Sequence, residues 1–201
     1  MELNLKGKKA LITGGSKGIG LAIKKALEAE GVECKSWSRS EGVNLMEPGI
    51  PFFPDVDILI NNVGGMGTSL YEDSDDCMEK NYGIMKKTIK AFILKPHRDG
   101  RVITISSIYG KEKGHCPWFD AAKAAQIAYM KCMSNKLPGT TFNTICPGYI
   151  NTGKFKIKDF KKHYIGMPND VARMVVFLCS PDSSFINGAT ITVDGGESHS
   201  F

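Results

Sequence analysis

The turn at residues 13–20 constrains the fold of this chain more than any other part of its sequence. A short apolar run, Lys9–Thr13, leads into glycines at positions 14, 15, 18 and 20, and apolar residues at helical spacing follow over 19–29. Glycines permit a tight strand-to-helix turn and let a ligand approach the backbone, and the N–H groups at the helix start can hold a pyrophosphate. A strand-to-helix turn without a ligand can carry the same glycines, so this turn alone leaves its ligand open.

The rest of the chain alternates between strand-like and helical segments. Apolar runs at 32–37, 56–60, 101–106, 141–146 and 189–193 predict strands, and longer segments at 75–94, 118–133 and 169–179 predict helices. This alternation favours a parallel sheet with helices on both faces. We therefore expect an α/β fold, a Rossmann-type doubly wound parallel sheet, in a single domain over residues 1–201. Residues 40–54 leave no room for a crossover helix, so the third strand of such a sheet is expected to be vestigial.

Composition excludes several classes of protein. No apolar run is long enough to span a membrane, and the first residues lack the layout of a signal peptide, so we expect a cytoplasmic protein without membrane contact. A net charge of +5 is too mild to indicate nucleic-acid binding. The six cysteines and four histidines are scattered, without the spacing of metal ligands, so no metal site is expected.

Several motifs, taken in order, resemble those of the short-chain dehydrogenase/reductase family. Besides the glycine turn they are Asn61-Asn62-Val63-Gly64, a helical Asn81, Ile105-Ser106-Ser107, Pro147-Gly148-Tyr149-Ile150-Asn151-Thr152 and Val193-Asp194-Gly195-Gly196. The resemblance implies an oxidoreductase that interconverts a small carbonyl compound and its alcohol by hydride transfer, as a homodimer or homotetramer. It also implies the residues that line the dinucleotide, which are Gly14, Ser16, Lys17, Gly18, Ile19, Asn44, Leu45, Asn62, Val63, Gly64, Lys123, Pro147, Gly148, Ile150 and Thr152.

The residues after the second strand favour NADP(H) over NAD(H). In such folds an acidic residue at this place binds the ribose 2′-hydroxyl of NAD, whereas an arginine accommodates the 2′-phosphate of NADP. Arg39 stands there with no carboxylate before it, and Lys17 can add a second positive charge. If both were ordinary solvated charges, the sequence would carry no preference.

The resemblance implies four catalytic positions, of which three match: Asn81, Ser107 and Lys123. The family's tyrosine, whose hydroxyl carries the proton and whose pKa the lysine lowers, is replaced by Phe119. Tyr82 and Lys86 have the tyrosine–lysine spacing, but they directly follow Asn81 and no matching serine precedes them.

Three explanations of Phe119 stay open. A tyrosine could have been replaced deliberately to trap a complex. A natural enzyme could take its proton from Ser107, Tyr109, His115 or a water held by Lys123. The chain could also be a non-catalytic NADP(H)-binding regulatory or sensor protein, although such a protein would have no need of Ser107.

The segment at 154–163 is short and strongly basic. Its pattern favours a solvated amphipathic helix with its lysines turned outward. The alternative is an anionic substrate that these lysines attract.

Overall fold

The computed structural model describes residues 2–65, 74–114, 116–153 and 165–200. These residues form one parallel sheet of six strands: β1 (Lys9–Thr13), β2 (Glu33–Trp37), β3 (Ile58–Asn61), β4 (Gly100–Ile105), β5 (Thr140–Pro147) and β6 (Thr190–Val193). The strand order is β2-β1-β3-β4-β5-β6, and every neighbouring pair is parallel. The predicted α/β fold with a doubly wound parallel sheet is confirmed.

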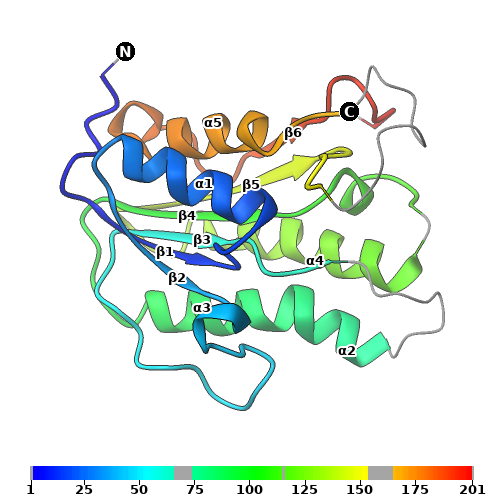
Figure 1. Ribbon diagram of the computed structural model, residues 1–201, viewed down its shortest axis with the longest axis horizontal. Coiled ribbons are helices and arrows are strands. Elements are labelled where there is room, and N and C mark those ends of the chain that lie inside the picture. The colour runs from blue at the N-terminus through cyan, green and yellow to red at the C-terminus, as the bar shows by residue number, and fades with distance from the viewer. Residues whose placement is uncertain (1, 66–73, 115, 154–164, 201) are drawn as a thin grey trace.

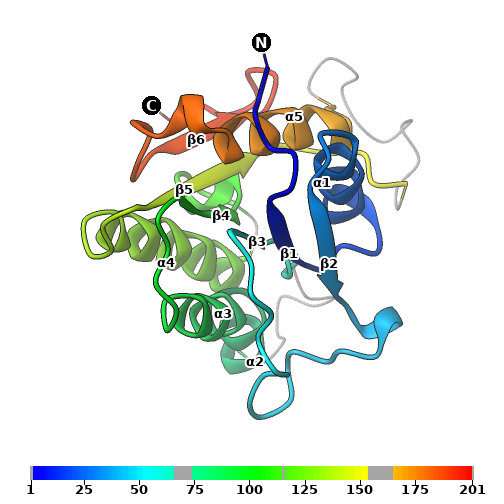
Figure 2. The ribbon, with the colours of Figure 1, turned by 90° about the vertical axis from the view of Figure 1, so that its left-hand side faces the viewer.

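Helices cover both faces of the sheet (Figures 1 and 2). One face packs against α1 (Gly18–Ala29) and α5 (Pro168–Cys179), and the other against α3 (Ile84–Phe92) and α4 (Pro117–Met133), with the short α2 (Ser74–Met78) beside α4. Apolar residues of the strands are buried on both faces because both are covered. Two hydrophobic clusters result, one centred on α1 and α5 and the other on α3 and α4.

The direction of winding reverses beside β1. The chain passes from β1 outward to β2 and then returns to place β3 on the other side of β1. At such a reversal the loops after the two inner strands separate and leave a crevice at the carboxyl edge of the sheet, which is where ligands of this architecture bind. The glycine turn follows β1 and the Asn61–Gly64 motif follows β3, so both border this crevice.

The region after β2 is as abbreviated as the sequence predicts. A single 3₁₀ turn over Arg39–Glu41 follows β2, and residues 42–57 contain no helix or strand. Leu45 and Val56 from this stretch pack into the core beside Trp37. Consequently β2 forms the outer edge of the sheet.

The helix predicted over 75–94 is interrupted. A π-helical turn over Glu79–Gly83 separates α2 from α3. This turn places Asn81, which is fully buried, at the side of the helix that faces α4. Such turns often occur where a helix contributes to a functional site.

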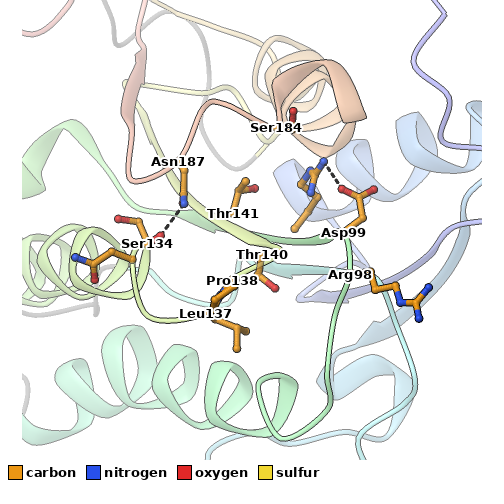
Figure 3. Close-up of a pocket in the computed structure, with 12 residues that line it drawn as sticks. Arg98, Asp99, Ser134, Leu137, Pro138, Thr140, Thr141, Ser184 and Asn187 are labelled. Carbon is orange, nitrogen blue, oxygen red and sulfur yellow. Dashed lines mark hydrogen bonds and ion pairs between the residues drawn. The ribbon is translucent and has the colours of Figure 1, made fainter.

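A polar pocket lies at the opposite, amino edge of the sheet (Figure 3). Residues before β4 and β5 line it, together with the end of α4 and the segment before β6. Its buried Arg101 is paired with Asp99 at 2.6 Å, and the side-chain amide of Asn187 donates to the Ser134 carbonyl at 2.6 Å. The pocket is thus at the far end of the strands from the glycine turn.

Within the described residues, no helix has the length and apolarity needed to cross a membrane.

Candidate active site

The glycine turn is locked to the end of β3. The amide of Asn62 donates to the carbonyl oxygens of Thr13 and Gly14, both at 3.1 Å, and the Thr13 hydroxyl accepts from the backbone N–H groups of Asn62 and Val63. A Cβ added at Gly20 would overlap the Gly14 carbonyl oxygen and come within 2.5 Å of the Asn62 amide. The turn therefore requires glycine at position 20 for close backbone packing, and the first two sequence motifs meet at one place.

The start of α1 borders the crevice. Lys17 is the N-cap residue with an extended backbone, and its side chain makes no capping hydrogen bond. The backbone N–H groups that begin a helix have no partners within it, so they can hold an anion. Thr152 closes one side, because a Cβ added at Gly18 would lie 3.2 Å from its methyl group. A dinucleotide pyrophosphate fits this cradle, and Ser16, Lys17, Gly18 and Ile19 are the residues that would hold it.

A carboxylate stands beside the turn, where the sequence predicts only a cation. Glu41 accepts from the hydroxyl of Ser36 at 2.7 Å and from that of Ser38 at 2.5 Å. The Ser38 hydrogen bond is the main cause that lowers the pKa of Glu41. A Cβ added at Gly15 would lie 2.5 Å from the Ser36 hydroxyl oxygen, so this group borders the glycine turn. Exposed Arg39 lies in the same 3₁₀ turn as Glu41.

Lys123 is the buried cation of the crevice. Its Nζ donates to the Ile105 carbonyl at 3.1 Å and to the Gln126 side-chain oxygen at 3.2 Å, while its own carbonyl accepts from the Ser106 hydroxyl at 2.9 Å. Among the described lysines it alone is buried, and burial lowers its pKa to about 8. The ammonium and the backbone carbonyl of Lys123 are therefore both hydrogen-bonded to residues at the end of β4 or directly after it.

Phe119 lies one helical turn before Lys123, with its ring centroid 5.4 Å from Nζ. The ring packs in a small cluster with Cys77, Cys116 and Tyr109 and is 9% exposed. Ser107 follows β4 and is half-buried, and its hydroxyl oxygen accepts from the Tyr109 N–H at 3.2 Å, which leaves its own proton free to be donated. A Cβ added at Gly110 would lie 2.8 Å from the Lys123 backbone, so the turn after Ser107 packs directly on α4.

Asn81 fixes the segment that follows β3. Its side-chain oxygen accepts from the Gly65 N–H at 3.0 Å, and its side-chain amide donates to the Cys77 carbonyl at 2.9 Å and to the Gly65 carbonyl at 3.2 Å. A Cβ added at Gly64 would lie 2.5 Å from the Asn81 oxygen and 3.3 Å from the Lys123 Nζ. Gly64, Asn81 and Lys123 therefore meet at one point of the carboxyl edge.

The remaining predicted site residues lie at the carboxyl edge, on the surface, in the core or outside the described residues. Pro147 is the last residue of β5 at the same edge, Gly148 follows it, and Ile150 forms an isolated bridge with Gly166. Asn44 donates to Glu47 on the surface, and the Leu45 side chain packs into the core at 5% exposure. His115 and the basic segment 154–163 lie outside the described residues. In the described part of the chain no three histidine, cysteine or carboxylate side chains gather as metal ligands.

Sequence reasoning missed two residues here, Glu41 and Gln126. Glu41 comes after Arg39, whereas the carboxylate that binds the ribose of NAD is expected before that position. Gln126 is the only glutamine of the chain and stands three residues after Lys123 on the same helix. That spacing places two side chains on one face of a helix and was the available signal.

Comparison with known proteins agrees with this arrangement. A family model described as enoyl-(acyl carrier protein) reductase matches residues 22–198. A 3-oxoacyl-(acyl-carrier-protein) reductase from Vibrio cholerae is 30% identical over 241 aligned positions, which cover 96% of this chain and 98% of that protein. An acetoacetyl-CoA reductase from Rhizobium meliloti is 30% identical, and the alignment covers 94% of this chain and 97% of that protein. Because the first alignment has 241 positions and this chain has 201 residues, at least 40 positions of that relative have no counterpart here.

Solved structures show the same relationship. A short-chain dehydrogenase from Burkholderia cenocepacia, in complex with NADP, superposes with a TM-score of 0.82 at 25% identity, covering 96% of this chain and 98% of that one. Fold, motif order, family model and relatives all agree. The chain belongs to the short-chain dehydrogenase/reductase family of oxidoreductases.

Proposed function

We propose that this protein is an NADP(H)-dependent oxidoreductase that interconverts a carbonyl compound and its alcohol. The observation that carries the proposal is the buried Lys123 ammonium, which lies beside Phe119 and the end of β4, on the same sheet edge as the glycine turn. A protein that only bound a dinucleotide would need the glycine turn. It would not need Ser107 or the contact among Asn81, Gly64 and Lys123, which favours a catalytic role.

The cofactor assignment rests on the crevice and on the relatives. The glycine turn and the start of α1 would hold the pyrophosphate, and Asn62, Val63 and Gly64 would line the adenosine ribose side. Arg39 and Lys17 supply positive charge for a 2′-phosphate. The Burkholderia relative carries NADP, which supports NADP(H) over NAD(H) for this chain.

Bound dinucleotide supplies or accepts the hydride. The side chains of this chain position the substrate oxygen and handle the proton. Ser107 donates its free hydroxyl proton to the substrate oxygen in a hydrogen bond. The Lys123 ammonium supplies the proton that the reduced oxygen needs, and a group with a pKa of about 8 can do so at neutral pH. Asn81 holds the backbone that follows β3 against this lysine.

The relatives suggest the substrate class. Two of them are named as reductases of 3-oxoacyl and acetoacetyl thioesters. We propose a 3-oxoacyl thioester on an anionic carrier, which agrees with the strongly basic sequence of residues 154–163. We also expect one catalytic domain over residues 1–201, acting as a homodimer or homotetramer in the cytoplasm.

Turnover with acetoacetyl-CoA tests the function. Loss of NADPH absorbance should be slow but measurable, and it should fall as pH rises through about 8, because Lys123 then loses the proton that reduction consumes. Ser107→Ala and Lys123→Met should each lower the rate further. Tyr82→Phe is the control and should leave it unchanged. Tight NADPH binding without consumption of any 3-oxoacyl thioester would contradict the proposal and would instead match a sensor.

The groups at the 2′ end of the site are tested by a matched pair of variants. Arg39→Ala should weaken NADPH binding about 10-fold or more while leaving NADH binding nearly unchanged, since an arginine–phosphate contact is worth about 1.5–3 kcal/mol. Glu41→Gln should do the opposite and tighten NADPH binding several-fold, because it removes a carboxylate beside the phosphate. Fluorescence titration with both dinucleotides measures the two effects. Tighter binding of NADH than of NADPH to the unmodified protein would overturn the cofactor assignment.

A further inference from the structure

Gln126 joins two parts of the site that otherwise belong to different helices. Its side-chain amide donates from Nε2 to the backbone carbonyl of Asn81 at 2.9 Å, and its Oε1 accepts from the Lys123 Nζ at 3.2 Å. The residue is 1% exposed, so both hydrogen bonds are shielded from water.

The chemistry of the two partners settles which way the amide points. The Asn81 carbonyl can only accept a hydrogen bond, and the Lys123 ammonium can only donate. The amide nitrogen must therefore face Asn81 and the amide oxygen must face Lys123. Asn81 lies within the π-helical turn over Glu79–Gly83, which departs from the regular hydrogen-bond ladder of an α-helix.

Few other groups of the described residues stabilise the charge on Lys123. Besides Gln126, the Ile105 carbonyl accepts from its Nζ at 3.1 Å, and the Phe119 ring offers its π face at 5.4 Å. In the described part of the chain, the titratable groups that face it are Cys77 from α2 and Cys146 from β5. Burial raises the pKa of Cys146 to about 11, so this thiol stays neutral through the pH range that matters. A buried ammonium in such surroundings depends strongly on each neutral acceptor it has.

We propose that Gln126 is a positioning residue, whose amide ties the Lys123 ammonium to the Asn81 carbonyl and keeps the lysine charged and fixed at the reacting end of the site. The hydrogen bond from Lys123 to Gln126 matters more in this chain because Phe119 gives the ammonium no hydroxyl to bond. The role of Gln126 in catalysis rests on the proposed function. The electrostatic effect on Lys123 itself does not, and it can be measured without cofactor.

The titration of Lys123 in the cofactor-free protein is the decisive measurement. Lysine labelled with ¹³C at Cε gives a resonance that shifts on deprotonation, and the Lys123→Arg variant identifies the one that belongs to Lys123. A hydrogen bond to a charged group is worth about 1.5–3 kcal/mol, so Gln126→Met should lower the midpoint by about one pH unit or more. Gln126→Glu should raise it, because a carboxylate then faces the ammonium. This second variant keeps the test valid if the first fails to fold.

Met130→Ala is the matched control. Met130 is buried on α4 one turn after Gln126, in the hydrophobic cluster centred on α3 and α4. Its truncation should lower the melting temperature and leave the Lys123 midpoint in place. A purely structural role for Gln126 predicts the same pattern for Gln126→Met, with a lower melting temperature and an unchanged midpoint, and that result would overturn the proposal.

NADPH titration separates this inference from the proposed function. In the unmodified protein binding should weaken as pH rises through the Lys123 midpoint, and in Gln126→Met the weakening should begin at lower pH by the same interval. Failure of the unmodified protein to bind NADPH would defeat the proposed function, while the resonance midpoints would still decide the role of Gln126.

Discussion

Replacement of Phe119 by tyrosine should raise the rate of carbonyl reduction about 10²–10⁴-fold, the range that general acid catalysis typically contributes. The variant adds one oxygen to a ring that already lies beside the Lys123 ammonium, so ring packing is kept. A free tyrosine titrates near about 10, and a neighbouring ammonium lowers its pKa, which makes the added phenol a better acid near neutral pH. The measurement is kcat for acetoacetyl-CoA at saturating NADPH, together with its pH profile.

Trp118→Tyr provides the control. Trp118 is the preceding residue on α4, and its side chain is 45% exposed, so a tyrosine there gains a hydroxyl on the surface and away from Lys123. Its rate should match that of the unmodified protein. An active protein whose rate does not change on Phe119→Tyr would show that its proton takes a different route, as one of the three explanations of Phe119 holds.

Gly20→Ala should abolish most dinucleotide binding. The added methyl group would overlap the Gly14 carbonyl oxygen and press on the Asn62 amide, so the glycine turn must open. Overpacking of this kind costs about 1–3 kcal/mol of stability. Since the same backbone forms the pyrophosphate cradle, we expect a loss of NADPH affinity on the order of 100-fold, equivalent to about 2.7 kcal/mol. Isothermal titration calorimetry and thermal unfolding give the two quantities.

Gly42→Ala is the comparison that isolates the effect of crowding. Gly42 has a φ of +79°, but a Cβ there would meet no atom within 4 Å. Alanine in such a left-handed conformation costs about 1–2 kcal/mol through backbone strain alone. Its NADPH affinity should stay close to that of the unmodified protein. Equal affinities for Gly20→Ala and Gly42→Ala would mean that the turn tolerates a side chain and that the cradle lies elsewhere.

The strands and helices could be predicted from sequence because their patterns are local. The apolar runs and glycine turns are short-range signals, and predicted and observed boundaries differ by at most about two residues for most elements. The interruption of the helix at Glu79–Gly83 could not be predicted, because a π-helical turn changes hydrogen-bond partners without changing the apolar spacing.

The site was predictable only as far as its motifs reach. Asn81, Ser107 and Lys123 were found through the family pattern, and the structure places them around one edge. Glu41 and Gln126 were not found, because their importance depends on contacts between distant segments: a serine pair at the end of β2, and a carbonyl on another helix. Leu45 shows the converse, since a motif position gave its place along the chain but not that its side chain packs into the core.

The edge position of β2 has a consequence for solubility. A strand without an outer neighbour presents free backbone N–H and C=O groups to other chains, and natural proteins protect such edges with charged side chains and short strands. Here the strand has five residues, and Glu33 and Lys35 are exposed along it. If β2 of a second copy paired with this strand in parallel and in register, Glu33 would face Glu33 and Lys35 would face Lys35, and these like charges would repel. We therefore expect the short length of β2 and the charges of Glu33 and Lys35 to protect this edge of the sheet against aggregation.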